Sequence, residues 1–159
     1  MIYESSLAIT ADTIHMIVLS DSVLSPQIMI DSIPVIDDED DTIDDLFNLR
    51  VLNMHSDQQA VDFYLSKENE SFNDAVLVGQ YSYQQLSDNQ KIDQDDYIFY
   101  ITTAGSDDVL FRSSSIAFAY SSQNIMVVKE NTGTGTSSYV LDKISDSMVI
   151  EYVDPDSEA

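Results

Sequence analysis

Short runs of alternating hydrophobic and polar residues dominate the chain, and this is the pattern of half-buried β-strands. Val61, Phe63 and Leu65 alternate with more polar neighbours, whereas Tyr97–Thr103 is β-branched and aromatic throughout. Further short apolar runs occupy His15–Leu19, Ile116–Tyr120, Ile125–Val128, Tyr139–Leu141 and Met148–Val153. Clusters of Ser, Asp, Asn and Gly separate the runs, and helical periodicity is weak. The pattern predicts an all-β fold, an immunoglobulin-like antiparallel β-sandwich.

An internal repeat predicts how this fold is distributed along the chain. Leu7–Asp21 aligns without a gap with Ile116–Glu130, and Ile28–Ile33 then matches Tyr139–Ile144. Residues 1–35 therefore read as the C-terminal strands of a partial first repeat, and residues 46–150 as a complete sandwich repeat. Because β patterns are degenerate, the alternative is a chance alignment of two β-rich stretches.

Two acidic segments mark the boundaries of these parts. Residues 36–45 contain the run Asp37–Asp41, whose like charges resist burial and favour an extended linker. Residues 151–159 read as an acidic tail. The strands of residues 1–35 lack the rest of their sandwich, so alone they cannot bury an apolar face or pair their edges. We therefore predict a homodimer formed by strand pairing or swapping of this N-terminal segment.

The charge of the chain narrows the range of partners. Lys and Arg number 6 against 29 Asp and Glu, which gives a formal net charge of -23. This surface repels phosphate backbones, so we expect no nucleic-acid binding. Hydrophobic residues make up 43% of the chain, enough for a core. The acidity is therefore interpreted first as a source of solubility.

Compartment is predicted from features that the sequence lacks. It contains no cysteine, and none of its apolar runs reaches the roughly 18 residues of a membrane span, so we expect no direct membrane insertion. The first residues do not have the basic and apolar regions of a signal peptide. We expect a periplasmic, outer-membrane-anchored or extracellular protein whose signal sequence is not in this chain.

Several short motifs carry a resemblance to a known family. Arg50–Leu65 combines a strand, a turn with Ser and Asp, and an Ala-Val-Asp-Phe-Tyr strand. Further matches are Tyr83, Leu86–Asp88, Asp96–Tyr97 and Thr102–Gly105. Over roughly residues 46–144 the chain resembles the DUF4397 domain family, a bacterial family of unknown function. It departs from that family at Ser56 and Gln59, where proline is common, and at Asp95, where glycine is common.

The resemblance implies a β-sandwich that often occurs in tandem copies and is often exported or lipid-anchored in bacteria. It implies no activity, because none is established for the family. No catalytic or cofactor-binding residue is therefore carried over to this chain.

The residues themselves offer little chemistry for catalysis. No Gly-x-Ser-x-Gly motif is present, and His15 and His55 are the only imidazoles. His15 is interpreted as a strand residue, and His55 as the start of a turn closed by a hydrogen bond near Asp57. Two histidines without nearby partners make zinc and iron sites improbable. We expect no enzyme.

Carboxylates leave calcium as the one cofactor to consider. Hard oxygen ligands are abundant in the acidic run and in the turn after Thr103, although neither follows the EF-hand spacing. The candidate ligands are Asp37, Asp38, Asp40, Asp41, Asp107 and Asp108. Solvated carboxylates without a metal are the simpler interpretation.

Two functions from different classes follow. The first is a non-catalytic cell-envelope or extracellular module with a structural, adhesive or protein-interaction role, whose partner is a protein or a surface polymer. The alternative is a protein that binds calcium or a small ligand through its acidic loops.

Overall fold

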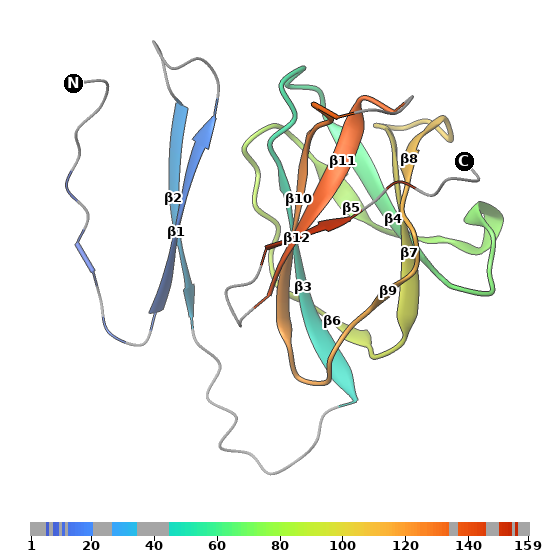
Figure 1. Ribbon diagram of the computed structural model, residues 1–159, viewed down its shortest axis with the longest axis horizontal. Coiled ribbons are helices and arrows are strands. Elements are labelled where there is room, and N and C mark those ends of the chain that lie inside the picture. The colour runs from blue at the N-terminus through green and yellow to red at the C-terminus, as the bar shows by residue number, and fades with distance from the viewer. Residues whose placement is uncertain are drawn as a thin grey trace. The chain divides into compact units, whose positions relative to one another are not determined.

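The chain divides into two compact units, Met1–Thr42 and Ile43–Ala159. The computed structural model describes residues 6, 8, 9, 11, 13–20, 27–34, 45–133, 137–145, 150–153 and 155. In the first unit, β1 (Thr13–Ser20) and β2 (Gln27–Pro34) form an antiparallel hairpin, as Figure 1 shows.

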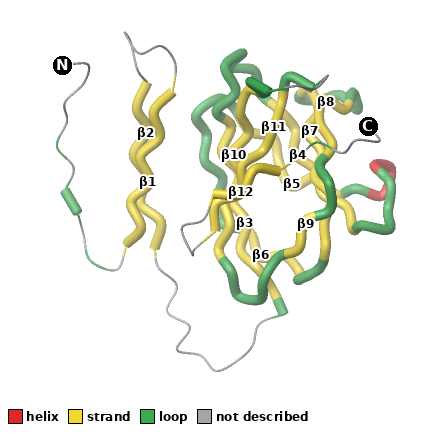
Figure 2. The backbone as a smooth tube through the Cα atoms, in the orientation of Figure 1, coloured by secondary structure: helices red, strands yellow, loops and turns green. Residues whose placement is uncertain are grey.

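The described residues of the second unit form ten strands and one short 3-10 turn. Figure 2 draws the strands in yellow and the turn in red. The turn, η1, covers Phe72–Asp74. The strands are β3 (Leu46–Asn53), β4 (Val61–Lys67), β5 (Val76–Tyr81), β6 (Gln90–Asp93), β7 (Asp96–Thr103), β8 (Val109–Arg112), β9 (Ile116–Ala117), β10 (Gln123–Glu130), β11 (Tyr139–Ser145) and β12 (Ile150–Val153).

These strands form two sheets that pack face to face. The first sheet has the order β12-β11-β10-β3-β6, and the second has the order β5-β4-β7-β8 with β9 paired to β7. The prediction of an all-β sandwich is confirmed. Antiparallel pairing dominates, but β3 and β10 run parallel, with Val51 opposite Met126. No helix in the described parts of the chain is long and apolar enough to cross a membrane.

Strand alternation explains the core between the sheets. On β3, Phe47, Leu49 and Val51 are completely buried. Phe118, which follows β9, stacks on Phe47 with ring centroids 4.2 Å apart and meets Phe99 of β7 edge-on at 5.7 Å. The ring of Phe118, in the connection after β9, therefore packs against β3 of the first sheet and β7 of the second.

The C-terminal boundary differs from the prediction. Residue 150 was expected to end the sandwich, but β12 continues through Val153 and pairs antiparallel with β11. Val153 is buried against the core, which explains why this acidic stretch is held in the sheet. Pro155 forms a further bridge with Ser113.

The two segments aligned by the internal repeat both form antiparallel hairpins, β1–β2 and β10–β11. Their registers differ. Ile17 lies opposite Ile30 in the first hairpin, whereas Met126 and Leu141, the residues aligned with them, are not opposite each other. The shift is two residues, which keeps every residue on its own face. The common origin of the two hairpins stays a prediction.

Candidate functional site

A cluster of hydrogen-bonded polar groups lies at the end of the sandwich where β3 passes into the loop before β4. Asn53, the last residue of β3, is completely buried. Its amide nitrogen donates to the backbone oxygens of Gln59 at 2.8 Å and Tyr81 at 3.1 Å. Its side-chain oxygen accepts from the backbone N–H of His55 at 3.2 Å. Asn53 therefore ties the loop to both sheets, because Tyr81 ends β5.

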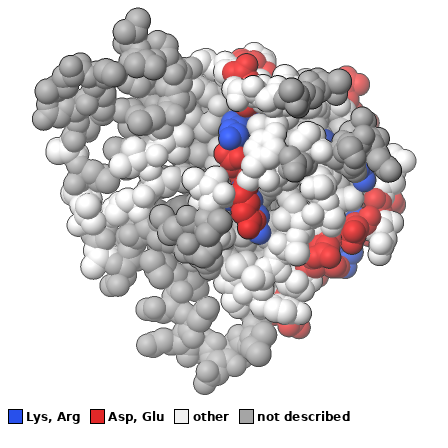
Figure 3. Space-filling model, viewed as in Figure 1, with Lys and Arg blue, Asp and Glu red and all other residues white. Residues whose placement is uncertain are grey.

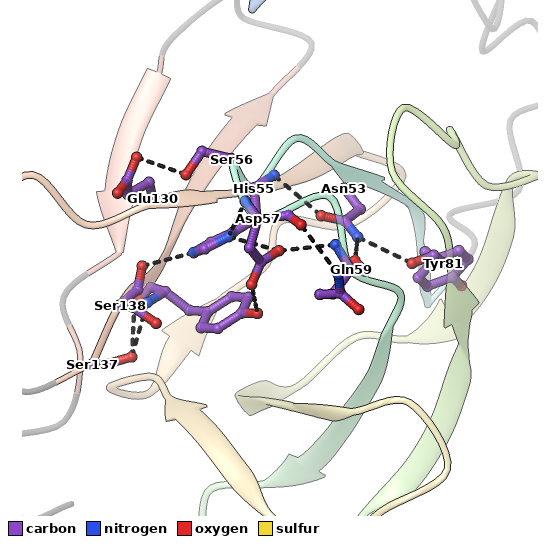
Figure 4. Close-up of polar contacts among 10 residues, drawn as sticks. Asn53, His55, Ser56, Asp57, Gln59, Tyr81, Glu130, Ser137 and Ser138 are labelled. Carbon is purple, nitrogen blue, oxygen red and sulfur yellow. Dashed lines mark hydrogen bonds and ion pairs between the residues drawn. The ribbon is translucent and has the colours of Figure 1, made fainter. Parts of the chain in front are cut away.

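His55 follows and places its imidazole in the centre of this cluster (Figure 4). Nε2 lies 2.9 Å from the backbone oxygen of Ser138, so this nitrogen must carry a proton and donate it. Nδ1 accepts from the backbone N–H of Asp57 at 3.2 Å when the ring is neutral. The ring also stacks on Tyr139, with centroids 3.9 Å apart. The turn hydrogen bond predicted for His55 is thus present.

Asp57 is held by three groups around it. One carboxylate oxygen accepts from the backbone N–H of Gln59 at 2.9 Å and lies 3.0 Å from Nδ1 of His55, and the other accepts from the hydroxyl of Tyr139 at 2.5 Å. Burial alone would raise the pKa of Asp57, but these hydrogen bonds and the neighbouring imidazole outweigh it, and the pKa is lowered. Burial, and then the hydrogen bond to Asp57, raise the pKa of Tyr139.

This arrangement contains a carboxylate and an imidazole in contact, the pair that supplies the base in Ser-His-Asp hydrolases. In those enzymes the second imidazole nitrogen faces a nucleophilic hydroxyl. Here Nε2 of His55 faces the carbonyl oxygen of Ser138, which has no proton to give. The residue is also buried, with 4% of its surface exposed. The cluster therefore joins the loop after β3 to the start of β11.

A buried carboxylate, that of Asp62, lies on the outer side of the second sheet. Asp62 of β4 accepts hydrogen bonds from the backbone N–H of Gly105 at 2.7 Å and from the side chain of Gln80 at 2.9 Å. Gly105 has a φ of 75°, which glycine adopts without strain, and it lies in the turn between β7 and β8. The contact joins the Ala-Val-Asp and Thr-x-Ala-Gly motifs on which the family resemblance rests.

The candidate calcium ligands are not brought together among the residues described. Asp107 and Asp108 are exposed in the turn before β8, where the backbone N–H of Asp108 donates to Oγ of Ser106 at 3.1 Å. Asp37, Asp38, Asp40 and Asp41 lie outside the described residues. Within the described part, no group of three or more His, Asp or Glu side chains is placed to hold a metal ion. His15 lies in β1 opposite Ser32.

Sequence reasoning found part of this site. The spacing of His55 and Asp57 indicated the turn, but nothing marked Tyr139, which lies 82 residues beyond Asp57. Asn53 and Asp62 also gave no separate signal, because a polar residue at either end of a strand is ordinary.

Comparison with known proteins adds no relative. No family model matches the chain, and no curated protein is significantly similar to it. The resemblance to the DUF4397 domain family therefore stays a prediction.

Proposed function

We propose that this chain is a non-catalytic β-sandwich module of the cell envelope or extracellular space. It acts by binding a protein or a surface polymer, and it associates as a homodimer through its N-terminal segment. The observation that carries the proposal is the exposure of large apolar side chains on outermost strands. Val76 and Leu77 of β5 are 65% and 50% exposed, and Ile150 and Tyr152 of β12 are 65% and 51% exposed.

Exposed apolar side chains on a terminal strand favour the addition of a strand or surface from a partner. β5 also contains no charged residue, in a protein with a net charge of -23. The outer residues of β5 thus form an uncharged strip at one end of the second sheet, which suits a partner protein.

The polar cluster around His55 supports a structural role for its three titratable side chains, those of His55, Asp57 and Tyr139. Their hydrogen bonds are made to neighbouring parts of the same sandwich, and they fix the loops at one end of it. A module that presents loops and strand edges to a partner needs this rigidity.

The test of the dimer is light scattering on the eluting peak of the full chain. We expect a mass of twice 17.8 kDa at micromolar concentration. A strict monomer over the whole concentration range would contradict association through the N-terminal segment. Protease accessibility in intact source cells tests the location, since an envelope or extracellular module is cleaved without lysis.

A further inference from the structure

The outer face of the first sheet carries an apolar surface directed away from the core. The strand registers place eight residues in two rows across β3, β10, β11 and β12. The first row is Leu52, Val127, Asp142 and Tyr152, and the second is Arg50, Ile125, Ile144 and Ile150. Six of the eight are apolar. Leu52 and Ile125 are buried, whereas Ile150 and Tyr152 are 65% and 51% exposed. This composition is typical of an interface.

The same face gathers basic residues in a strongly acidic protein. Arg50, Lys91 and Lys129 are three of the six Lys and Arg residues of the chain, and their registers place all three here. Nζ of Lys129 lies 2.6 Å from Asp142 and 5.9 Å from the ring centre of Tyr152. Figure 3 shows, on the face that it draws, that the few basic side chains lie beside acidic ones.

Arg50 adds an unused donor to this surface. Its Nε is buried, and it has no hydrogen-bond partner among the residues described. An unpaired buried donor is costly. The positive charge of the guanidinium favours a partner that brings negative charge. The face therefore suits a partner that is apolar and also brings negative charge.

The β1–β2 hairpin of another copy has both properties. Ile14 lies opposite Ile33, and Ile17 lies opposite Ile30, so apolar residues occupy both alternating sets of positions. Asp31 is the only charged residue in the two strands, and the acidic run Asp37–Asp41 follows shortly after β2. A two-stranded hairpin is marginally stable alone, and one with two apolar sets needs a layer on each side.

We propose that the outer face of the first sheet is the docking surface for a second copy of this chain, whose β1–β2 hairpin covers the two rows. The inference rests on the homodimer proposed above and assigns its surface. Two copies related by a two-fold axis place two hairpins between two sandwiches, and each hairpin is then covered on both sides.

The test compares two substitutions in the full chain by light scattering. Ile150→Asp and Val76→Asp each replace an apolar side chain that is 65% exposed, and each adds one negative charge. Val76 lies on β5 of the other sheet. We expect wild type and Val76→Asp to elute as dimers and Ile150→Asp to elute as a monomer.

A second pair guards against misfolding of an aspartate variant. Tyr152 and Tyr120 are 51% and 55% exposed, and both are replaced by Asn. Tyr152→Asn is expected to weaken the dimer at least tenfold, and Tyr120→Asn to leave its dissociation constant unchanged. Circular dichroism melts show that each variant keeps its sandwich.

The outcomes separate this inference from the proposal on which it rests. A monomeric wild type overturns both. In a second outcome, Ile150→Asp and Tyr152→Asn remain dimeric but Ile17→Asp is a monomer. This result would support association through the N-terminal hairpin and would overturn the outer face as its docking surface.

Discussion

At the scale of single residues, two carboxylates hold connections between strands, the buried one of Asp62 and the partly exposed one of Asp57. Asp57 fixes the loop between β3 and β4 through Tyr139, and Asp62 fixes the turn between β7 and β8 through Gly105. Both act by accepting hydrogen bonds, which are stronger to a charged group than to a neutral one. Each can be tested by removing one partner.

Tyr139→Phe removes the hydroxyl that donates to Asp57 and keeps the ring that stacks on His55. We expect the free energy of unfolding to fall by about 1–2 kcal/mol, because the hydrogen bond to the carboxylate is lost. The loss is no larger because the carboxylate is partly exposed and solvent screens the contact. Tyr120→Phe, at an exposed tyrosine, is the control and should change stability by under about 0.5 kcal/mol. Urea unfolding at neutral pH measures both.

The same contact makes stability depend on pH. Because the pKa of Asp57 is lowered in the folded state, its contribution is present above the pKa of the unfolded chain, about 4, and is lost as pH falls through the folded value. The raised pKa of Tyr139 acts on the other side, since its contribution is complete below about pH 10 and is lost as pH rises further. Tyr139→Phe should flatten both limbs of a stability curve measured by thermal melts. Unchanged limbs would show that the contact is weak in solution.

Asp62→Ala leaves the N–H of Gly105 without its acceptor and the side chain of Gln80 without a partner. We expect a loss of about 1–3 kcal/mol in the free energy of unfolding. Hydrogen exchange should speed up at Gly105 and in the turn before β8. Asp108→Ala removes an exposed carboxylate in the same turn, and little change is expected there.

At the scale of strands, alternation in the sequence predicted most elements because it follows directly from the two-residue period of a half-buried sheet. The 3-10 turn at Phe72–Asp74 was not predicted, although Ser71 and Asp74 have the spacing of a capping pair. The carboxylate of Asp74 accepts from both the N–H and Oγ of Ser71. The parallel pairing of β3 with β10 could not be predicted from the sequence either, because the residue pattern of one strand does not indicate the direction of the strand beside it.

Phe118 shows how far a connection contributes to the packing of strands. It lies just after β9, yet its ring stacks on Phe47 and meets Phe99. Phe118→Ala is expected to cost about 3–5 kcal/mol in the free energy of unfolding, because it opens a cavity between the two sheets. Tyr120→Ala, two residues later and exposed, should cost far less. Equal losses in the two variants would mean that the chain here is held by its backbone.

At the scale of the whole molecule, the net charge of -23 on 159 residues produces electrostatic repulsion that destabilises the compact folded state. Salt screens that repulsion, and the Debye length falls from about 30 Å at 0.01 M to about 8 Å at 0.15 M. We expect the melting temperature to rise by several degrees over this range in sodium chloride. The same rise in potassium chloride would assign it to screening, whereas a rise confined to one salt would indicate specific ion binding.

The parallel pair at the centre of the first sheet has a consequence for how the protein is made. Asn48 of β3 lies opposite Gln123 of β10, so the ribosome adds 75 residues (123 minus 48) before these strands can meet. β4 and β5, and then β7 and β8, are neighbours in sequence and can pair as soon as they emerge. Local contacts form faster than distant ones, so we expect the second sheet to assemble during synthesis. Until β10 arrives, one edge of β3 stays open, and wrong strand pairing between nascent chains is most probable in that interval.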